Sequence, residues 1–231
     1  MASLYNFPYY EKHMVAYGLT KENDWIEIQI NPQCETPERV LRIDKLVRER
    51  YHLRVDKVHS AKELERKYGM EYMDMLDEAY QKLYNFQPMT PRQKEHYKKV
   101  YFPLLNFDFV TIVVNEKNEI VGIGLGMPDI SHALRRCKGR LFPFGWIRLL
   151  RALKAKQMDA FDLLLIGVRP DYQGMGVNAV IIAEQHPYYR KYGIKRVETT
   201  SIMETNTRNI ANFLMFPHKQ HKRRRAYEKQ I

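Results

Sequence analysis

The spacing of apolar residues along the chain predicts two kinds of element. In residues 24–30, apolar side chains alternate with polar ones up to Pro32, which is the pattern of a half-buried strand. The sequence NEKN joins two apolar runs and predicts a hairpin, and the last residues, 225–231, form an extended piece. The predicted strands are residues 24–30, 53–58, 109–114, 119–127, 162–168 and 195–202.

Helices are predicted where apolar residues recur every three or four positions behind a capping residue. Thr36 is the expected N-cap of one helix, with Pro37 at its first position. Ser60 begins a long amphipathic helix, and Thr90 begins another. The order of the elements predicts an α/β (α+β) domain on a mixed sheet. The predicted helices are residues 36–51, 60–84, 90–101, 145–155 and 177–192, with one more starting near Asn206.

Composition limits the class of protein. With 231 residues, 45% of them hydrophobic, the chain can bury the core of one large domain. No apolar run approaches the roughly 20 residues of a membrane-spanning helix, so we expect a cytoplasmic protein without a membrane partner. Cys34 and Cys137 stand far apart without metal-ligand spacing, so we expect reduced thiols and no metal site.

The net charge of +11 favours an anionic partner: nucleic acid, anionic lipid or a phosphorylated cofactor. Residues 142–156 form a basic amphipathic helix that suits a membrane surface, although packing over the sheet or against a partner is the favoured interpretation. His218 and His221 precede a run of arginines. Without a carboxylate or cysteine at ligand spacing, they indicate a solvated or coenzyme-facing basic edge rather than a metal or RNA site.

The sequence VRPDYQGMGVN, residues 168–178, follows a predicted strand and precedes a helix. Its glycines allow close approach of the backbone, and a helix N-terminus favours an anion, so the stretch predicts a pyrophosphate cradle. It lacks the Lys-Ser/Thr ending of the nucleoside-triphosphate loop and the spacing of the dinucleotide fingerprint.

This stretch resembles the coenzyme A loop of the GCN5-related N-acetyltransferase (GNAT) superfamily, a resemblance that covers roughly residues 52–231. Asn178 departs from the pattern, which has Gly or Ala there. The sequence NTRNIANF, residues 206–213, is similar to the superfamily's helix whose Asn contacts pantetheine, with Phe213 in place of a Tyr that often protonates the thiolate. The matching loop residues are Val168, Pro170, Tyr172, Gln173, Gly176 and Asn178.

The resemblance implies acetyl-coenzyme A or coenzyme A as cofactor and a mostly antiparallel sheet flanked by helices, with a splayed strand pair at the cofactor. A strand bulge whose amides bind pantetheine is expected at residues 166–168. The residues implied to bind the cofactor are Ile166, Gly167, Val168, Gln173, Gly174, Met175, Gly176, Val177, Asn178, Asn206, Asn209 and Phe213.

A closer likeness is to the C-terminal half of a bacterial group of uncharacterised proteins with two such domains in tandem. It implies that residues 1–35 are a remnant of a preceding GNAT-like domain. Residues 36–231 are then the acyltransferase domain, with a basic, aromatic insertion at residues 131–158. The segment 5–30 is expected to pair with this sheet or with that of a second copy, and a homodimer would cover an open strand edge.

The implied reaction is N-acetyl transfer to an amine whose identity the sequence leaves open. Glu198 is the expected base, with Glu204 second, and the N–H of Val168 is the candidate that polarises the carbonyl. Tyr227 is a distant substitute for the acid. Residues 223–225 are arginines that suit the coenzyme's 3′-phosphate or an acidic substrate. The alternatives are a degenerate coenzyme A-binding or interaction module and, more weakly, a nucleic-acid-binding protein, for which no motif is present.

Overall fold

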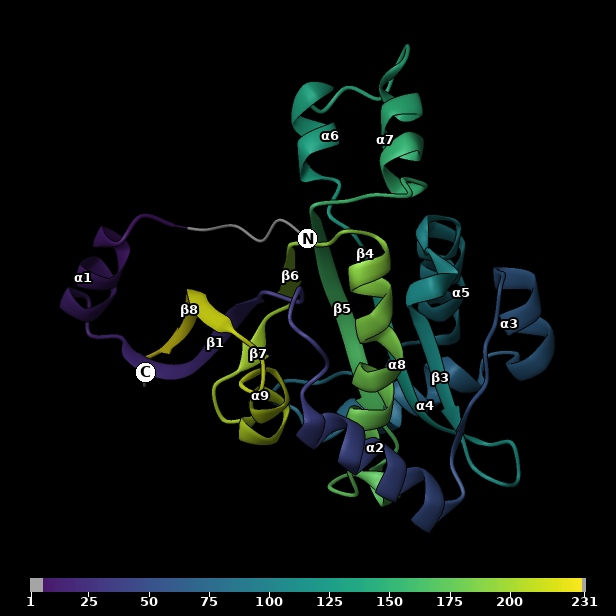
Figure 1. Ribbon diagram of the computed structural model, residues 1–231. Coiled ribbons are helices and arrows are strands. Elements are labelled where there is room, and N and C mark those ends of the chain that lie inside the picture. The colour runs from purple at the N-terminus through teal and green to yellow at the C-terminus, as the bar shows by residue number, and fades with distance from the viewer. Residues whose placement is uncertain (1–5, 230–231) are drawn as a thin grey trace.

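The computed structural model describes residues 6–229 and has one mixed sheet at its centre (Figure 1). The strand order is β2-β3-β4-β5-β6-β1-β7, and β8 pairs with β1. The neighbours are antiparallel except β5 and β6, which run parallel. This confirms the predicted fold class. The strands are β1 (Thr20–Ile30), β2 (Arg54–Val55), β3 (Val110–Val114), β4 (Ile120–Pro128), β5 (Ala160–Val168), β6 (Arg196–Thr199), β7 (Ile202–Met203) and β8 (His218–Glu228).

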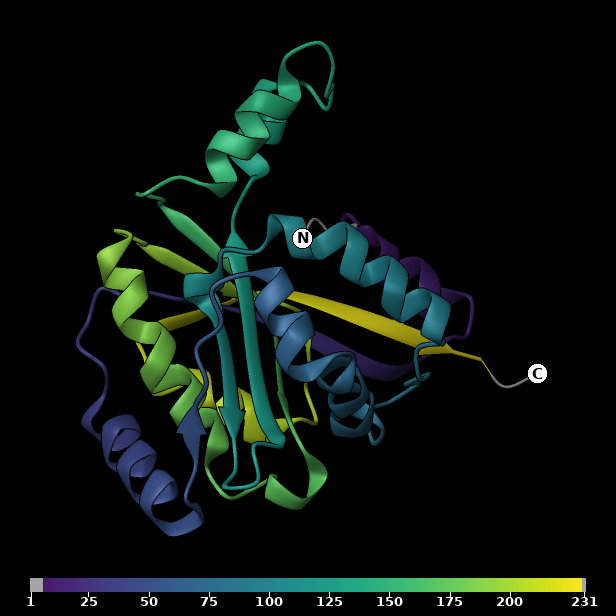
Figure 2. The same ribbon diagram turned by 90° about the vertical axis from the view of Figure 1, so that its right-hand side faces the viewer.

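Helices cover both faces of the sheet (Figure 2). Helices α2 and α8 pack on one face through Val47, Val177 and Ile181, while α3 and α4 pack on the other through Leu64 and Leu76. No helix of the described residues is long and apolar enough to cross a membrane. The helices are α1 (Tyr9–Ala16), α2 (Glu38–Tyr51), α3 (Ala61–Tyr68), α4 (Glu71–Tyr80), α5 (Pro91–Tyr101), α6 (Ser131–Arg136), α7 (Gly145–Leu153), α8 (Val177–Lys191) and α9 (Thr207–Phe213).

Several predicted elements are confirmed. The hairpin is β3–β4, and Thr90 caps α5 through a capping box with Gln93. Both cysteines are free thiols. Two boundaries differ from the prediction. The helix expected at 60–84 is divided at Gly69, whose φ of +53° ends α3. Helix α2 begins after Pro37 rather than after Thr36, because the Thr36 hydroxyl lies 2.8 Å from His186 Nδ1 instead of capping the helix.

Other strands differ in length from the prediction. Residues 53–58 contain strand pairing only at β2, and residues 195–202 divide into β6 and β7. The basic residues 218–225, expected to form a basic edge, belong to the long strand β8, which pairs with β1 alone among the described strands. The extended piece predicted at 225–231 is therefore the end of this strand, and residues 230–231 lie outside the described residues.

Strand β1 lies inside the sheet, between β6 and β8. Gln29 pairs with Glu198 of β6, and β8 pairs with β1 from Thr20 to Ile30. Its apolar residues Ile26 and Ile28 are buried in the core shared with α8. The expected pairing of this segment with the sheet is thus present, while its origin in a preceding domain stays a prediction; residues 1–5 lie outside the described part.

The basic segment 131–158 projects from the sheet as a hairpin of α6 and α7 (Figures 1 and 2). Residues 142–156 were expected to pack over the sheet or against a partner; they do not lie over the sheet, and packing against a partner stays a prediction. The hairpin's two short helices contact each other, and Cys137 and Leu153 are its buried apolar residues. Most of the hairpin's surface faces away from the domain.

Candidate functional site

Strands β5 and β6 separate in the middle of the sheet. Their parallel ladder ends at the pair Leu163 and Thr199, but β5 continues to Val168. No strand of the described chain pairs with the edge of residues 164–168 that faces away from β4. The carbonyls of Leu164, Ile166 and Val168 accept hydrogen bonds from side chains, so a ligand on this edge would meet its backbone amides.

A bulge lies where the two strands separate. Leu125 pairs with Leu165 and Gly126 with Leu163, so Leu164 is an extra residue in β5. The bulge therefore precedes the position expected from the sequence, residues 166–168. The hydroxyl of Thr200 donates to the Leu164 carbonyl at 3.2 Å, which holds the diverging chains together at this point.

The glycine-rich loop connects β5 to α8. Gly174 and Gly176 have φ of +83° and +91°, a backbone conformation that favours glycine, and Gly176 is the N-cap of α8. The side-chain amide of Gln173 donates to the carbonyls of Val168 and Ala79, at 3.0 and 3.2 Å. Gln173 thus joins the loop to β5 and α4. Its side-chain nitrogen makes these two hydrogen bonds within the protein.

The loop residues fit an anionic group. A helix N-terminus presents amides without intrahelical partners, which here begin at Val177. A Cβ atom on Gly174 would lie 3.6 Å from Arg208 Nη1, so a guanidinium stands beside the loop. The Asn178 side-chain oxygen is buried and has no hydrogen-bond partner among the described residues, but this atom is an acceptor and does not itself favour an anion.

The helix expected to contact pantetheine is α9. Its N-cap Asn206 accepts a hydrogen bond from the Asn209 amide at 3.3 Å, so these two residues bind each other. Phe213 is buried in the core and lines a narrow apolar cavity with Leu163 and Ile166. Arg208 is the α9 residue that lies beside the glycine-rich loop. The sequence motif contains this arginine, but no role was predicted for it.

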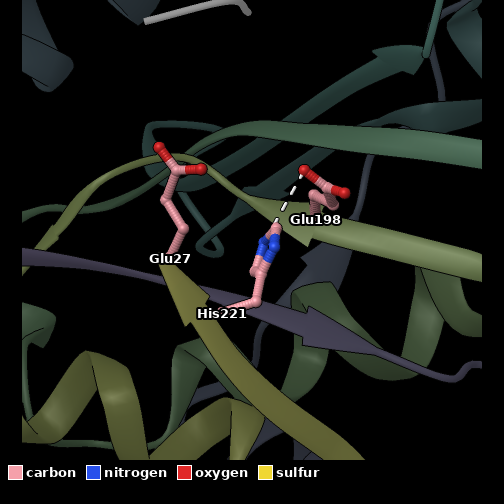
Figure 3. A group of neighbouring side chains, drawn as sticks. All are labelled: Glu27, Glu198 and His221. Atoms are coloured by element: carbon pink, nitrogen blue, oxygen red, sulfur yellow. Dashed lines mark ion pairs between the residues drawn. The ribbon is translucent and has the colours of Figure 1, made fainter. Parts of the chain in front are cut away.

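On the sheet, Glu27 of β1, Glu198 of β6 and His221 of β8 form a charged cluster (Figure 3). Their ligand-type atoms lie within 4.8 Å of one another, and His221 Nε2 is 3.8 Å from Glu198 Oε2. The sequence showed no carboxylate at ligand spacing from His221, because these three residues come from distant strands. Lys222 Nζ already lies 2.9 Å from Glu27 and 3.3 Å from Glu198.

The carboxylates near this point differ in basicity. Burial raises the pKa of Glu27, but hydrogen bonds from Lys222 and Arg224 outweigh it and hold that pKa below its usual range. Asp162 of β5 pairs in register with Glu198, so both project from the same face. Burial raises the pKa of Asp162. The sequence reasoning missed Asp162, whose one signal was an acid within an apolar strand.

Other predicted site residues lie elsewhere. Tyr227 pairs with Lys21 of β1, whereas Glu198 pairs with Gln29. Eight residues of strand correspond to about 26 Å, which leaves Tyr227 outside the region where β5 and β6 separate. Glu204 forms ion pairs with Lys21 and Arg223.

The arginines expected to suit a phosphate bind carboxylates of β1 instead. Arg223 and Arg225 pair with Asp24, and Arg224 pairs with Glu27. Their charges are therefore used within the sheet.

No protein-family model matches the chain. Among curated proteins, it is 38% identical over 113 residues to Protein YghO of Escherichia coli, covering 46% of this chain and 28% of that protein. It is 25% identical over 164 residues to the bacterial ceramide synthase of Caulobacter vibrioides, covering 68% of this chain and 42% of that protein. The chain thus spans less than half the length of either relative.

Solved structures share the fold. A GCN5-related N-acetyltransferase from Sphaerobacter thermophilus matches 94% of this chain and 55% of its own, with a TM-score of 0.57 and 16% identity. A tandem GNAT protein from the clavulanic acid biosynthesis pathway matches 96% of this chain and 58% of its own, with a TM-score of 0.51 and 9% identity. The sheet and these matches show that the chain has the GNAT fold.

Proposed function

We propose that this protein is an acyl-coenzyme A-dependent N-acyltransferase. The observation that carries the proposal is the unpaired edge of β5, which leads from the bulge at Leu164 to the glycine-rich loop and the N-terminus of α8. An extended arm ending in a pyrophosphate matches such a path, because strand backbone can pair with the arm while the helix terminus favours the phosphates.

The chain's own residues would hold such a ligand at three points. Amides at the start of α8, with Arg208 beside them, would bind the pyrophosphate of coenzyme A. Backbone amides on the open edge of residues 166–168 would donate hydrogen bonds to the pantetheine arm. Tyr80 donates a hydrogen bond to the Ile166 carbonyl at 3.0 Å, so α4 holds this segment of β5 in place. Bound acyl-coenzyme A supplies an acyl group activated as a thioester.

As the nitrogen of the acceptor amine bonds to the acyl carbon, the carboxylate of Glu198 or Asp162 would accept the proton of the amine, and the C–S bond would break to release coenzyme A as its thiolate. The two carboxylates project from the same face of neighbouring strands, next to the point where the strands separate. Glu198 remains our candidate for the base, and Asp162, whose pKa burial raises, is the alternative. The Val168 amide remains our candidate for polarising the acyl carbonyl.

The acceptor would be a primary amine. The relative from Caulobacter vibrioides is named a ceramide synthase, and a ceramide contains an amide formed on an amino lipid. This name supports amide formation as the reaction class for our chain, with acetyl and longer acyl groups both to be tested as donors.

Thermal unfolding with and without acetyl-coenzyme A tests the proposal. At about 100 times its Kd, a ligand stabilises the folded state by about 2.7 kcal/mol, which raises the unfolding midpoint by several degrees. Met175→Glu places a negative charge on an exposed loop residue and should weaken binding about tenfold. Val100→Glu, an equal change on exposed α5, should have no effect.

Two outcomes would overturn the proposal. One is the absence of any shift with acetyl- or long-chain acyl-coenzyme A at millimolar concentration. The other is a shift that Met175→Glu and Val100→Glu reduce equally, because the ligand would then bind away from the loop. Binding without acyl transfer to any amine of a library would leave the chain a non-catalytic coenzyme A-binding module.

A further inference from the structure

The α6–α7 hairpin exposes large apolar side chains at its tip. Phe142 is 79% exposed, Phe144 71% and Trp146 45%. Leu141 precedes them, and Leu150 follows on the turn of α7 above Trp146. Single exposed apolar residues are common, but a contiguous group on a projecting element marks an interaction surface.

The tip has a fixed shape. Trp146 Nε1 donates to the Pro143 carbonyl at 3.1 Å, and Arg148 Nη1 donates to the Arg136 carbonyl at 3.2 Å. A Cβ atom on Gly145 would lie 2.0 Å from the Arg140 carbonyl oxygen, so the loop closes tightly against the start of α7. The apolar side chains are therefore held outward by a structured loop.

The same hairpin is strongly basic. Segment 131–158 contains neither aspartate nor glutamate. None of its lysines or arginines forms an ion pair within the part of the chain that the structure describes. Its cations are Arg135, Arg136, Lys138, Arg140, Arg148, Arg151, Lys154 and Lys156.

We propose that the α6–α7 hairpin docks the protein on the surface of an anionic phospholipid bilayer. Aromatic side chains would enter the interfacial layer, and the surrounding cations would meet the lipid phosphates. Helix α7 has nine residues and is about 14 Å long, which suits a helix that lies at the interface rather than across a bilayer of about 30 Å.

Other partners fit this surface less well. A nucleic-acid duplex would pair with the cations but leave Phe142 and Phe144 in water. A second copy of the hairpin would bring two sets of unpaired cations together, and like charges repel. A bilayer with anionic headgroups can take up the apolar side chains of the tip and pair with the cations around them.

Vesicle co-sedimentation of the full chain tests the proposal. Binding is expected to vesicles of phosphatidylcholine and phosphatidylglycerol at 7:3, and it should fall with added salt and with pure phosphatidylcholine. The double variant Phe142→Ser/Phe144→Ser should lower the binding at least tenfold. Leu41→Ser/Leu46→Ser on α2, which also changes two exposed apolar residues, is the matched control and should bind normally.

Trp146 supplies an independent readout, because the chain has only two tryptophans. In a Trp25→Phe background, the emission of Trp146 should move to shorter wavelength on anionic vesicles. Unchanged emission, or equal losses of binding in the Phe and Leu double variants, would overturn the proposal. So would a dimer in sedimentation velocity that the Phe variant dissociates, since the tip would then be a protein interface. Unchanged unfolding midpoints establish that each variant folds.

Discussion

The guanidinium of Arg225 lies 2.7 Å from Asp24 Oδ1, and the Asp24 side chain has no exposed surface. The hydrogen bond from Arg225 is the main cause that lowers the pKa of Asp24, and Arg223 adds to it against the effect of burial. The pair joins the middle of β1 to β8. Some of the chain's arginines therefore form ion pairs within the sheet.

Removing this buried charge should destabilise the fold. Asp24→Asn should lower the free energy of unfolding by about 3 kcal/mol at pH 7, because the two arginines then lose the negative charge that they share. Urea denaturation measures the change. Asp159→Asn removes the ion pair with Lys195, in which both side chains are exposed. It should lower the free energy of unfolding by less than about 1 kcal/mol. Equal effects of the two substitutions would contradict the role given to Asp24.

The same carboxylate predicts a pH dependence. Because the pKa of Asp24 is lower in the folded state, its contribution is complete above the unfolded value near 3.8 and is lost as the pH falls toward the folded value. The difference in unfolding free energy between wild type and Asp24→Asn should therefore shrink from pH 6 to pH 3. A constant difference across this range would refute the pKa assignment.

Gly176 should not tolerate a side chain. A Cβ atom there would lie 2.9 Å from methyl groups of Ile43 and Val47 on α2, and the φ of +91° is already unfavourable for other residues. Gly176→Ala should cost about 2 to 3 kcal/mol by urea denaturation. Gly193→Ala, with φ of +68° and no neighbour within 4 Å, should cost about 1 kcal/mol. A similar cost at both positions would show that the contact with α2 is unimportant.

If the proposed reaction is correct, Glu198→Gln should lower turnover about a hundredfold while the thermal shift with acyl-coenzyme A persists. The reason is that the amide cannot accept a proton but leaves the loop unchanged. Glu204→Gln serves as control, because its ion pairs lie toward the other end of β1. Full activity in Glu198→Gln, with loss in Asp162→Asn, would move the role of base to Asp162.

His186 predicts a second pH effect, near neutrality. Burial lowers the pKa of this histidine, whose Nε2 has no partner among the described residues. The unfolded chain takes up a proton near pH 6.5 that the folded state resists, so stability should fall between pH 7 and pH 5. His186→Gln should show a smaller fall by thermal unfolding. An equal fall in both proteins would exclude His186 as the cause.

The sequence predicted local features well where a few adjacent residues determine the backbone. The glycines of the loop and the cap of α5 at Thr90 are examples. It could not place His221 beside Glu27, because that contact depends on the order of strands. The spacing of apolar residues did not predict the break at Gly69, because the same spacing continues on both sides of it. The bulge at Leu164 depends on register with β4, which no single strand specifies.

The position of β1 has a consequence for how the chain folds. Its ladder with β8 joins residues nearly two hundred positions apart, so the entropy of closing that loop opposes its early formation. During synthesis, Ile26 and Ile28 emerge long before the strand that completes their surroundings. Until β8 leaves the ribosome, β1 is an open apolar edge exposed to aggregation. Productive folding should therefore depend on protection of this strand, for example by a chaperone, until translation of residues 218–228 is complete.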